Sequence, residues 1–127
     1  MANSKQVAHQ WGVEAEALAA EFLRHKGYRI LAERWRTGAG EIDVLAAENS
    51  ETLVVVEVKA RQKTSDGLWS VTPAKQKRLV RAAEVALSHH EKFTGLAPLT
   101  HLNIRFDVVI ITPDNAPEHL INAWQVE

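Results

Sequence analysis

The sequence of 127 residues contains no cysteine, which excludes disulfide bonds, thiolate metal ligands and a cysteine nucleophile. It has no apolar run long enough to cross a bilayer, and its first residues lack the charged-then-apolar pattern of a secretory signal. We therefore expect a cytoplasmic protein with no membrane partner. No repeat, low-complexity tract or linker divides the chain, so its length predicts a single domain over residues 1–127.

Several common functional motifs are also missing. Gly38-Ala39-Gly40 is too short for a dinucleotide-binding fingerprint, and there is no P-loop lysine motif. No serine, histidine and acid grouping indicates acyl transfer. The six histidines include no pair at helical ligand spacing, so we reject a zinc site.

Charge is unevenly distributed along the chain. The net charge of -1 argues mildly against a nucleic-acid partner. However, the segment from Lys59 to Arg81 holds seven basic residues and one acid, and the segment from Arg24 to Arg36 holds five and one. A near-neutral chain can still present a positive face, although solvated surface side chains remain the alternative.

The periodicity predicts a helix, then strands. Apolar residues recur at helical spacing between Ser4 and His25, and Gly27 is a plausible stop. An extended segment, Tyr28–Arg36, follows. Strands are predicted over Glu41–Ala47 and Leu53–Ala60, and the polar turn between them makes the pair a hairpin. The second strand begins with an unbroken apolar run, which is typical of a strand covered on both faces.

The second half predicts one more helix and one more strand. Thr72-Pro73 is a strong helix start, and this helix should end near His90. The preceding loop, Gln62–Val71, is expected to be mobile. Arg105–Thr112 reads as a core strand, and the tail containing Ile121 and Trp124 is apolar enough to dock back. The fold class is therefore α/β, a sandwich with a central mixed sheet flanked by helices.

The strongest chemical signal is Glu57-Val58-Lys59. Side chains alternate along a strand, so Glu57 and Lys59 point to the same face. A charge taken from water into protein costs several kcal/mol, so these two must be compensated or reach solvent. A simple ion pair and a metal site are both solutions.

Asp43 favours the metal site. In the hairpin it falls opposite the region of Glu57, with Glu41 on the same face and with Ile42 and Val44 on the other. Two carboxylates so placed repel each other unless one is protonated or a cation lies between them. Asp43 and Glu57, with the Val58 carbonyl, could ligate Mg²⁺ or Mn²⁺. Such a metal activates water and polarises a phosphoryl oxygen, while Lys59 orients that water or neutralises the phosphate.

Other residues have two interpretations. Glu16 lies on a helical surface of small residues, where it is either functional or simply solvated. The helix after Thr72 carries either phosphate-binding residues or an ordinary polar outer face. Trp35 either stacks on a nucleobase, with Arg34 and Arg36 as phosphate contacts on either side, or belongs to the core. Arg105 and Asp107 should form a structural ion pair. The candidate nucleic-acid-binding residues are Arg36, Arg61, Lys75, Gln76, Lys77 and Arg78.

Three motifs, Gly40-Glu41-Ile42-Asp43, Val56-Glu57-Val58-Lys59 and Arg105-Phe106-Asp107-Val108, resemble the YraN family of small, uncharacterised bacterial proteins. That family resembles the restriction-endonuclease-like PD-(D/E)xK superfamily, especially archaeal Holliday-junction resolvases. The resemblance implies a restriction-endonuclease-like sandwich. It also implies metal-ligand roles for Asp43 and Glu57, a catalytic lysine at Lys59 and an accessory catalytic acid at Glu16. The chain departs from the pattern at Ile42, where a proline often stands, and at Ala15, where a glycine is usual.

The leading hypothesis is a metal-dependent, structure-selective DNA endonuclease that acts on branched or duplex DNA. A non-catalytic nucleic-acid or protein adaptor on the same fold is the alternative, and an RNA-processing enzyme with the same site is a third. A homodimer would suit paired cleavage of two strands.

Overall fold

The computed structural model describes residues 4–62 and 71–124, and the strands in these ranges form one five-stranded sheet in the order β1-β2-β3-β4-β5. Every neighbouring pair is antiparallel except β3 and β4, which are parallel. The elements, in chain order, are α1 (Ser4–His25), β1 (Arg29–Thr37), β2 (Gly40–Asn49), β3 (Thr52–Ala60), α2 (Pro73–Ser88), the short 3₁₀ turns η2 (His90–Lys92) and η3 (Leu99–His101), β4 (Asn103–Ile111) and β5 (Glu118–Trp124).

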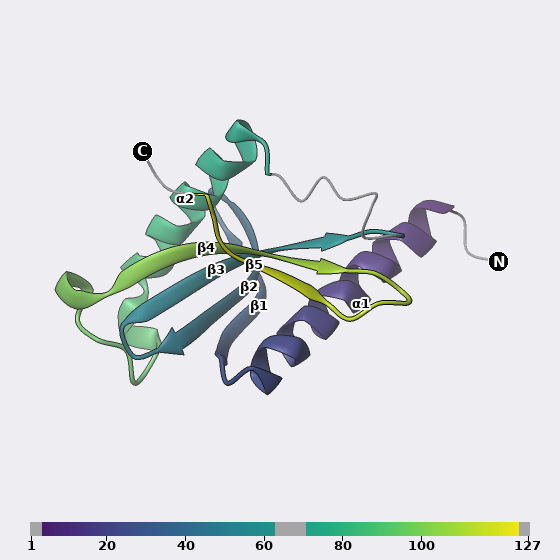
Figure 1. The fold of residues 1–127 in the computed structure, drawn as a ribbon. Coiled ribbons are helices and arrows are strands. Elements are labelled where there is room, and N and C mark those ends of the chain that lie inside the picture. Colours follow the sequence, from purple (N-terminus) through teal and green to yellow (C-terminus); the bar gives the residue numbers. More distant parts are fainter. Residues whose placement is uncertain (1–3, 63–70, 125–127) are drawn as a thin grey trace.

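The two long helices cover opposite faces of this sheet (Figure 1). The small residues Ala15, Ala19 and Ala20 let α1 approach β3 closely, and they pack with Val54 and Val56 in the α1-face core. The α2-face core is built on Leu79, Ala82, Ala83 and Ala86 of α2 with Leu45, Val55 and Val108 of the sheet. This layered arrangement is consistent with a restriction-endonuclease-like fold and confirms the predicted α/β class.

β3 lies in the middle of the sheet, between β2 and the parallel strand β4. Residues Leu53 to Val56 are at most 1% exposed, because helices cover both faces there. The hairpin register pairs Val44 with Val56, so Asp43 comes opposite the Glu57 region, as predicted. The backbone ladder is therefore what brings the acidic end of β2 to the charged end of β3.

The predicted end of α1 at Gly27 and the predicted start of α2 at Thr72-Pro73 are both confirmed by the backbone. After α1, Gly27 adopts a left-handed φ of 92°, and the N–H of Tyr28 donates to the carbonyl of Leu23 at 2.9 Å. At the start of α2, the Thr72 hydroxyl accepts from the N–H of Lys75 at 3.2 Å, with Pro73 in the first turn. The α2 helix ends at Ser88, two residues before the predicted end, where η2 takes over.

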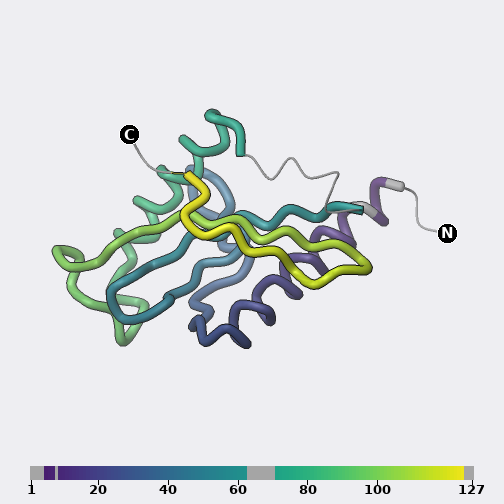
Figure 2. Tube along the Cα trace, viewed as in Figure 1, coloured from purple at the N-terminus to yellow at the C-terminus, as the bar shows by residue number. Residues whose placement is uncertain are grey.

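Two expectations change and one lies outside the structure. The docked tail is a full edge strand, β5, paired antiparallel with β4, and Figure 2 traces it in yellow beside the green of β4. The prediction that Ile42 and Val44 share a face is wrong, because Ile42 packs in the α2-face core and Val44 in the α1-face core. Residues 63–70, most of the loop expected to be mobile, lie outside the described residues.

No helix in the described part of the chain is long and apolar enough to span a bilayer.

Candidate active site

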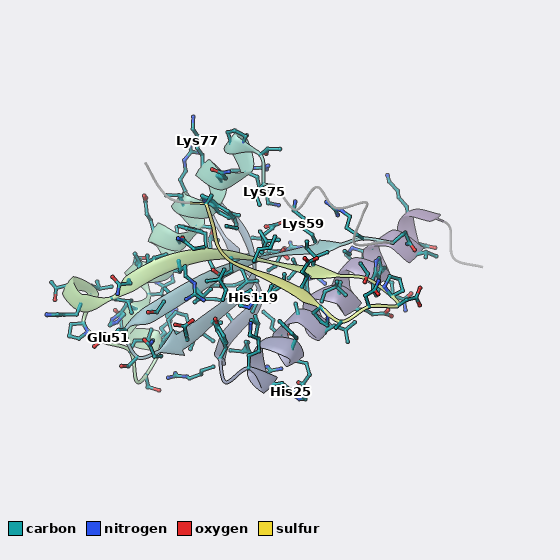
Figure 3. The ribbon with its side chains drawn as sticks, in the orientation of Figure 1. His25, Glu51, Lys59, Lys75, Lys77 and His119 are labelled. Atoms are coloured by element: carbon teal, nitrogen blue, oxygen red, sulfur yellow. The ribbon has the colours of Figure 1, made fainter. Side chains whose placement is uncertain are left out.

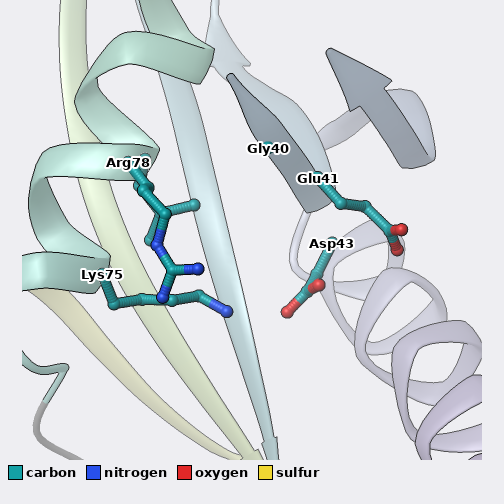
Figure 4. A pocket seen from close by; sticks show the side chains of 6 residues that line it. Gly40, Glu41, Asp43, Lys75 and Arg78 are labelled. Atoms are coloured by element: carbon teal, nitrogen blue, oxygen red, sulfur yellow. The ribbon is translucent and has the colours of Figure 1, made fainter. Parts of the chain in front are cut away.

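Three carboxylates from two elements meet at one end of the sheet. Glu16 projects from α1, and Glu41 and Asp43 project from β2. One carboxylate oxygen from each lies within 4.8 Å of the others, which is a spacing suited to a shared cation. Glu41 and Asp43 also line a pocket of about 270 Å³, which Gly40, Lys75, Arg78 and Leu79 complete (Figure 4).

Asp43 is the most perturbed acid of this group. Burial and then the negative charge of Glu57 raise the pKa of Asp43 to about 7. A hydrogen bond from the N–H of Val58 to Asp43 Oδ2, 2.8 Å long, acts in the opposite direction by stabilising the carboxylate. It is the N–H of Val58 that contacts Asp43, and a ligand role for the Val58 carbonyl stays a prediction. Asp43 therefore gains and loses its proton near neutral pH.

Glu57 lies beside Asp43 and is compensated by two lysines. It is 5% exposed, and its Oε1 lies 3.4 Å from Lys75 Nζ and 4.0 Å from Lys59 Nζ. Its other oxygen, Oε2, is buried with no hydrogen-bond partner among the described residues. The predicted same-face placement of Glu57 and Lys59 is correct, since the Nζ atoms of Lys59 and Lys75 both lie within 4.0 Å of Glu57 Oε1. Figure 3 labels these two lysines in the same region of the molecule. Glu57 thus keeps one oxygen that an ion or a water could use.

Glu16 is held by an arginine from the neighbouring edge of the sheet. Arg34 Nε lies 3.3 Å from Glu16 Oε2 and 3.6 Å from Glu41 Oε1, so one guanidinium joins α1 to β2. Burial raises the pKa of Glu16, and the charge of Arg34 opposes that rise. Glu16 Oε2 is nevertheless buried without a hydrogen bond from any described residue. The sequence left open whether Glu16 is solvated, and the structure places it in the acidic group.

Arg34 has an unusual backbone. Its φ of 49° lies in the left-handed region, which costs a bulky residue about 1–3 kcal/mol. The paired residues on either side, Glu33 with Val44 and Trp35 with Ile42, keep a continuous register. Arg34 therefore breaks the alternation of β1 without breaking the ladder. The alternation of β2 is broken at the same level, where Ile42 and Val44 pack in different cores.

The predicted phosphate-binding residues do not all gather at the pocket. Lys75 and Arg78 line it and project from α2 toward the strand of Asp43 (Figure 4). Lys77 points away from Lys75 and Lys59 in Figure 3. The Gln76 amide is engaged by the Val71 carbonyl, to which it donates at 2.8 Å.

The two remaining basic candidates lie at strand ends. Arg36 is 83% exposed and its Nε lies 3.4 Å from Glu41 Oε2, so its charge is already partly matched. Arg61 follows β3 and donates to the Ala60 carbonyl at 2.9 Å. Lys75 and Arg78 are thus the basic candidates that border the pocket, and phosphate binding by the whole set stays a prediction.

Two site residues escaped the sequence prediction. Glu41 was placed on the face of Asp43 but was not proposed as a ligand, and its carboxylate oxygen lies within 4.8 Å of those of Glu16 and Asp43 although the alternation of β2 fails between Ile42 and Val44. Arg34 was considered only as a phosphate contact beside Trp35. The ion pairs of Arg34 depend on its left-handed backbone, which no local sequence pattern predicts.

Trp35 belongs to the core rather than to an exposed stacking surface. It packs against the α2-face core, with its ring 5.9 Å from His89 and 5.7 Å from Phe93. The stacking interpretation therefore gives way to the alternative, in which Trp35 anchors β1 over α2.

A second polar network lies away from the pocket and fits a structural role. The buried carboxylate of Asp107 accepts two hydrogen bonds from Arg105 at 2.9 Å, one from His119 at 2.8 Å and one from the N–H of Asn122 at 2.9 Å. Burial alone raises the pKa of Asp107, but these bonds outweigh it and hold the pKa below its ordinary value. The predicted Arg105–Asp107 ion pair is confirmed.

The acidic group has the donor set of a hard divalent cation. Mg²⁺ and Mn²⁺ prefer oxygen ligands, and three carboxylates with oxygens within 4.8 Å supply them. Glu16 Oε2 and Glu57 Oε2 are buried and accept no hydrogen bond from the described residues, so these carboxylates keep acceptor capacity, although Arg34 forms an ion pair with Glu16 Oε2. The residues present therefore fit such an ion.

Comparison with known proteins gives a consistent result across most of the chain. The sequence model described as Uncharacterised protein family UPF0102 matches residues 15–111. A UPF0102 protein of Rhodopseudomonas palustris is 44% identical over 117 residues, which cover 92% of this chain and 85% of the relative. A UPF0102 protein of Parvibaculum lavamentivorans is 43% identical over 118 residues, covering 93% and 84%.

Proposed function

Since the chain belongs to the family described as Uncharacterised protein family UPF0102, the YraN family, we propose a catalytic role for the acidic group that its motifs build. The protein acts as a metal-dependent, structure-selective endonuclease on branched or duplex DNA. The family's descriptions carry no activity, so the proposal stands on the site alone.

One observation carries this proposal: acids and cations face each other across a single pocket. Glu41 and Asp43 line one side, and Lys75 and Arg78 line the other (Figure 4). A divalent ion suits the acids, and a phosphate suits the cations. A phosphodiester held between them has its scissile bond beside both. The pocket thus has the polarity that metal-assisted phosphodiester hydrolysis requires.

Each residue of the site has its own role in the proposed reaction. Glu16, Glu41 and Asp43 would hold Mg²⁺ or Mn²⁺, with Glu57 as a further ligand through its Oε2. The ion, when bound, would lower the pKa of a water and polarise a phosphoryl oxygen. Lys59, whose side chain is 20% exposed, orients the attacking water. Lys75 and Arg78 offset the charge that develops on the phosphate. Hydrolysis would form the bond from the water oxygen to phosphorus and break the bond to the leaving oxygen, and the proton released by the water would pass through solvent to that leaving oxygen.

A non-catalytic adaptor is the second candidate, and a specific observation favours it. Arg34 already forms ion pairs with Glu16 and Glu41, and Lys75 already forms one with Glu57, all without a metal. On this alternative the acids stabilise the fold only. DNA binding would then be salt-sensitive but indifferent to Mg²⁺.

Two measurements separate these candidates. Calorimetric titration of Mn²⁺ should show saturable binding that Asp43→Asn abolishes in a protein shown by circular dichroism to be folded. Cleavage of a four-way junction in Mg²⁺ should fall at least a hundredfold in Glu57→Gln, in line with loss of a metal ligand. Glu51→Gln, on an exposed turn, is the matched control and should cleave at the wild-type rate. Full-rate cleavage by Glu57→Gln would sink the catalytic assignment.

A further inference from the structure

The feature that the proposed mechanism does not use is the guanidinium of Arg34. It lies within 3.6 Å of carboxylate oxygens of Glu16 and Glu41, two of the three acids in the acidic group that Asp43 completes. It is attached to a backbone that an arginine adopts only at an energetic cost. A costly conformation persists when its surroundings compensate it, and here the two ion pairs provide that compensation.

We propose that Arg34 is a built-in competitor of the divalent ion: its guanidinium occupies the carboxylates of Glu16 and Glu41 in the metal-free protein and must leave them when metal enters. This inference rests on the proposed metal site and adds a regulatory contact to it. A cation that binds the same two carboxylates as a metal lowers the apparent metal affinity, because one must be displaced by the other.

The geometry supports displacement rather than a permanent bridge. Glu16 Oε2 lies 3.3 Å from Arg34 Nε, yet it has no hydrogen bond from any described residue, so this contact is an imperfectly oriented ion pair. A bidentate arginine–carboxylate pair would hold much more firmly. The Arg34 side chain is also 35% exposed, which gives the guanidinium an open path to solvent. A released Arg34 can therefore be hydrated without burying its charge.

The chain supplies a matched control. Arg24 of α1 also bridges two acids: its guanidinium lies 3.5 Å from Glu21 of α1 and 3.3 Å from Glu33 of β1. The Arg24 side chain is 47% exposed, and neither Glu21 nor Glu33 belongs to the acidic group. Removing Arg24 deletes the same charge and the same kind of bridge, but away from the proposed metal.

The test is a calorimetric titration of Mn²⁺ into wild type, Arg34→Asn and Arg24→Asn at low ionic strength. Asparagine is chosen because it tolerates the left-handed backbone while removing the charge. We expect Arg34→Asn to bind Mn²⁺ roughly tenfold more tightly, which corresponds to about 1.4 kcal/mol. We expect Arg24→Asn to change the affinity less than about twofold, because a distant exposed charge is screened. Equal affinities in Arg34→Asn and wild type, or weaker binding in Arg34→Asn, would overturn the inference.

A second measurement needs no variant. In ¹⁵N-labelled wild-type protein, Mg²⁺ should shift the Nε–H resonance of Arg34 and speed its exchange with water, while that of Arg24 stays in place. An unmoved Arg34 resonance at saturating Mg²⁺ refutes displacement even if Arg34→Asn does not fold. Failure of the metal site itself looks different: neither wild type nor Arg34→Asn would bind Mn²⁺. Binding seen in Arg34→Asn alone would support both the site and the competitor.

Discussion

Asp43→Asn should stabilise the metal-free protein at alkaline pH, although it removes a proposed metal ligand. The pKa of Asp43 is raised to about 7 in the folded protein, chiefly by burial and then by the charge of Glu57. An unfolded aspartate titrates near about 3.9. Because the folded state holds its proton more tightly, wild type loses stability as the pH rises from about 4 to about 7. Asparagine is neutral throughout and can still accept the Val58 N–H.

The size of the effect follows from this difference. About 3 pKa units at about 1.36 kcal/mol each give an upper limit of about 4 kcal/mol at pH values above about 7. Since Glu57 shares the local charge, we expect Asp43→Asn to exceed wild type by about 2–4 kcal/mol near pH 8. The two proteins should be equal within about 0.5 kcal/mol near pH 4. Urea unfolding followed by circular dichroism at both pH values, in the presence of a chelator, measures this.

The control is Asp114→Asn, the same chemical change at an exposed turn residue. It should alter stability by less than about 0.5 kcal/mol at either pH. Adding Mn²⁺ should narrow the difference at pH 8, because metal at about 100 times its Kd stabilises wild type alone by about 2.7 kcal/mol. An Asp43→Asn protein no more stable than wild type near pH 8 without metal would refute the electrostatic argument.

Three further predictions concern the proton of Asp43, the buried ion pair of Asp107 and the cap of α2. Mn²⁺ affinity of wild type, measured by calorimetry, should fall roughly tenfold per pH unit below about pH 7, because the metal must displace the proton of Asp43. Asp107→Ala should cost about 3–5 kcal/mol in urea unfolding, since it leaves Arg105 without its buried partner; a loss under about 1 kcal/mol would contradict that. Thr72→Ala should lower thermal stability by about 1 kcal/mol through loss of the α2 cap, and Thr72→Ser should restore most of it.

Most of the fold was predictable because local signals and burial agree. The Thr72-Pro73 start, the left-handed Gly27 and the apolar run of β3 each predict their element, and each is confirmed. β5 was predicted only as a docked tail. Its inner contacts are made with Asp107, through His119 and the N–H of Asn122, whose φ is 56°. A strand held by a distant buried carboxylate shows no clear alternation of its own.

The candidate site was predictable where it depends on one hairpin. Glu57, Lys59 and Asp43 follow from strand alternation and register alone. The ion pair of Lys75 with Glu57 requires the crossover that sets α2 over the end of β3. The contacts of Arg34 require a left-handed backbone conformation that no local sequence pattern predicts. Both belong to long-range geometry, which periodicity does not encode.

The parallel pairing of β3 with β4 has a consequence for how the chain folds. The hairpin β2–β3 forms from neighbouring residues, whereas the β3–β4 ladder joins segments about fifty residues apart and must await a costly loop closure. Until then, the apolar run Leu53–Val56 is an open edge that can recruit other chains. Glu57 and Lys59 end this run directly. We therefore expect the charges proposed for catalysis to limit aggregation as well, so neutralising both should lower the yield of refolding.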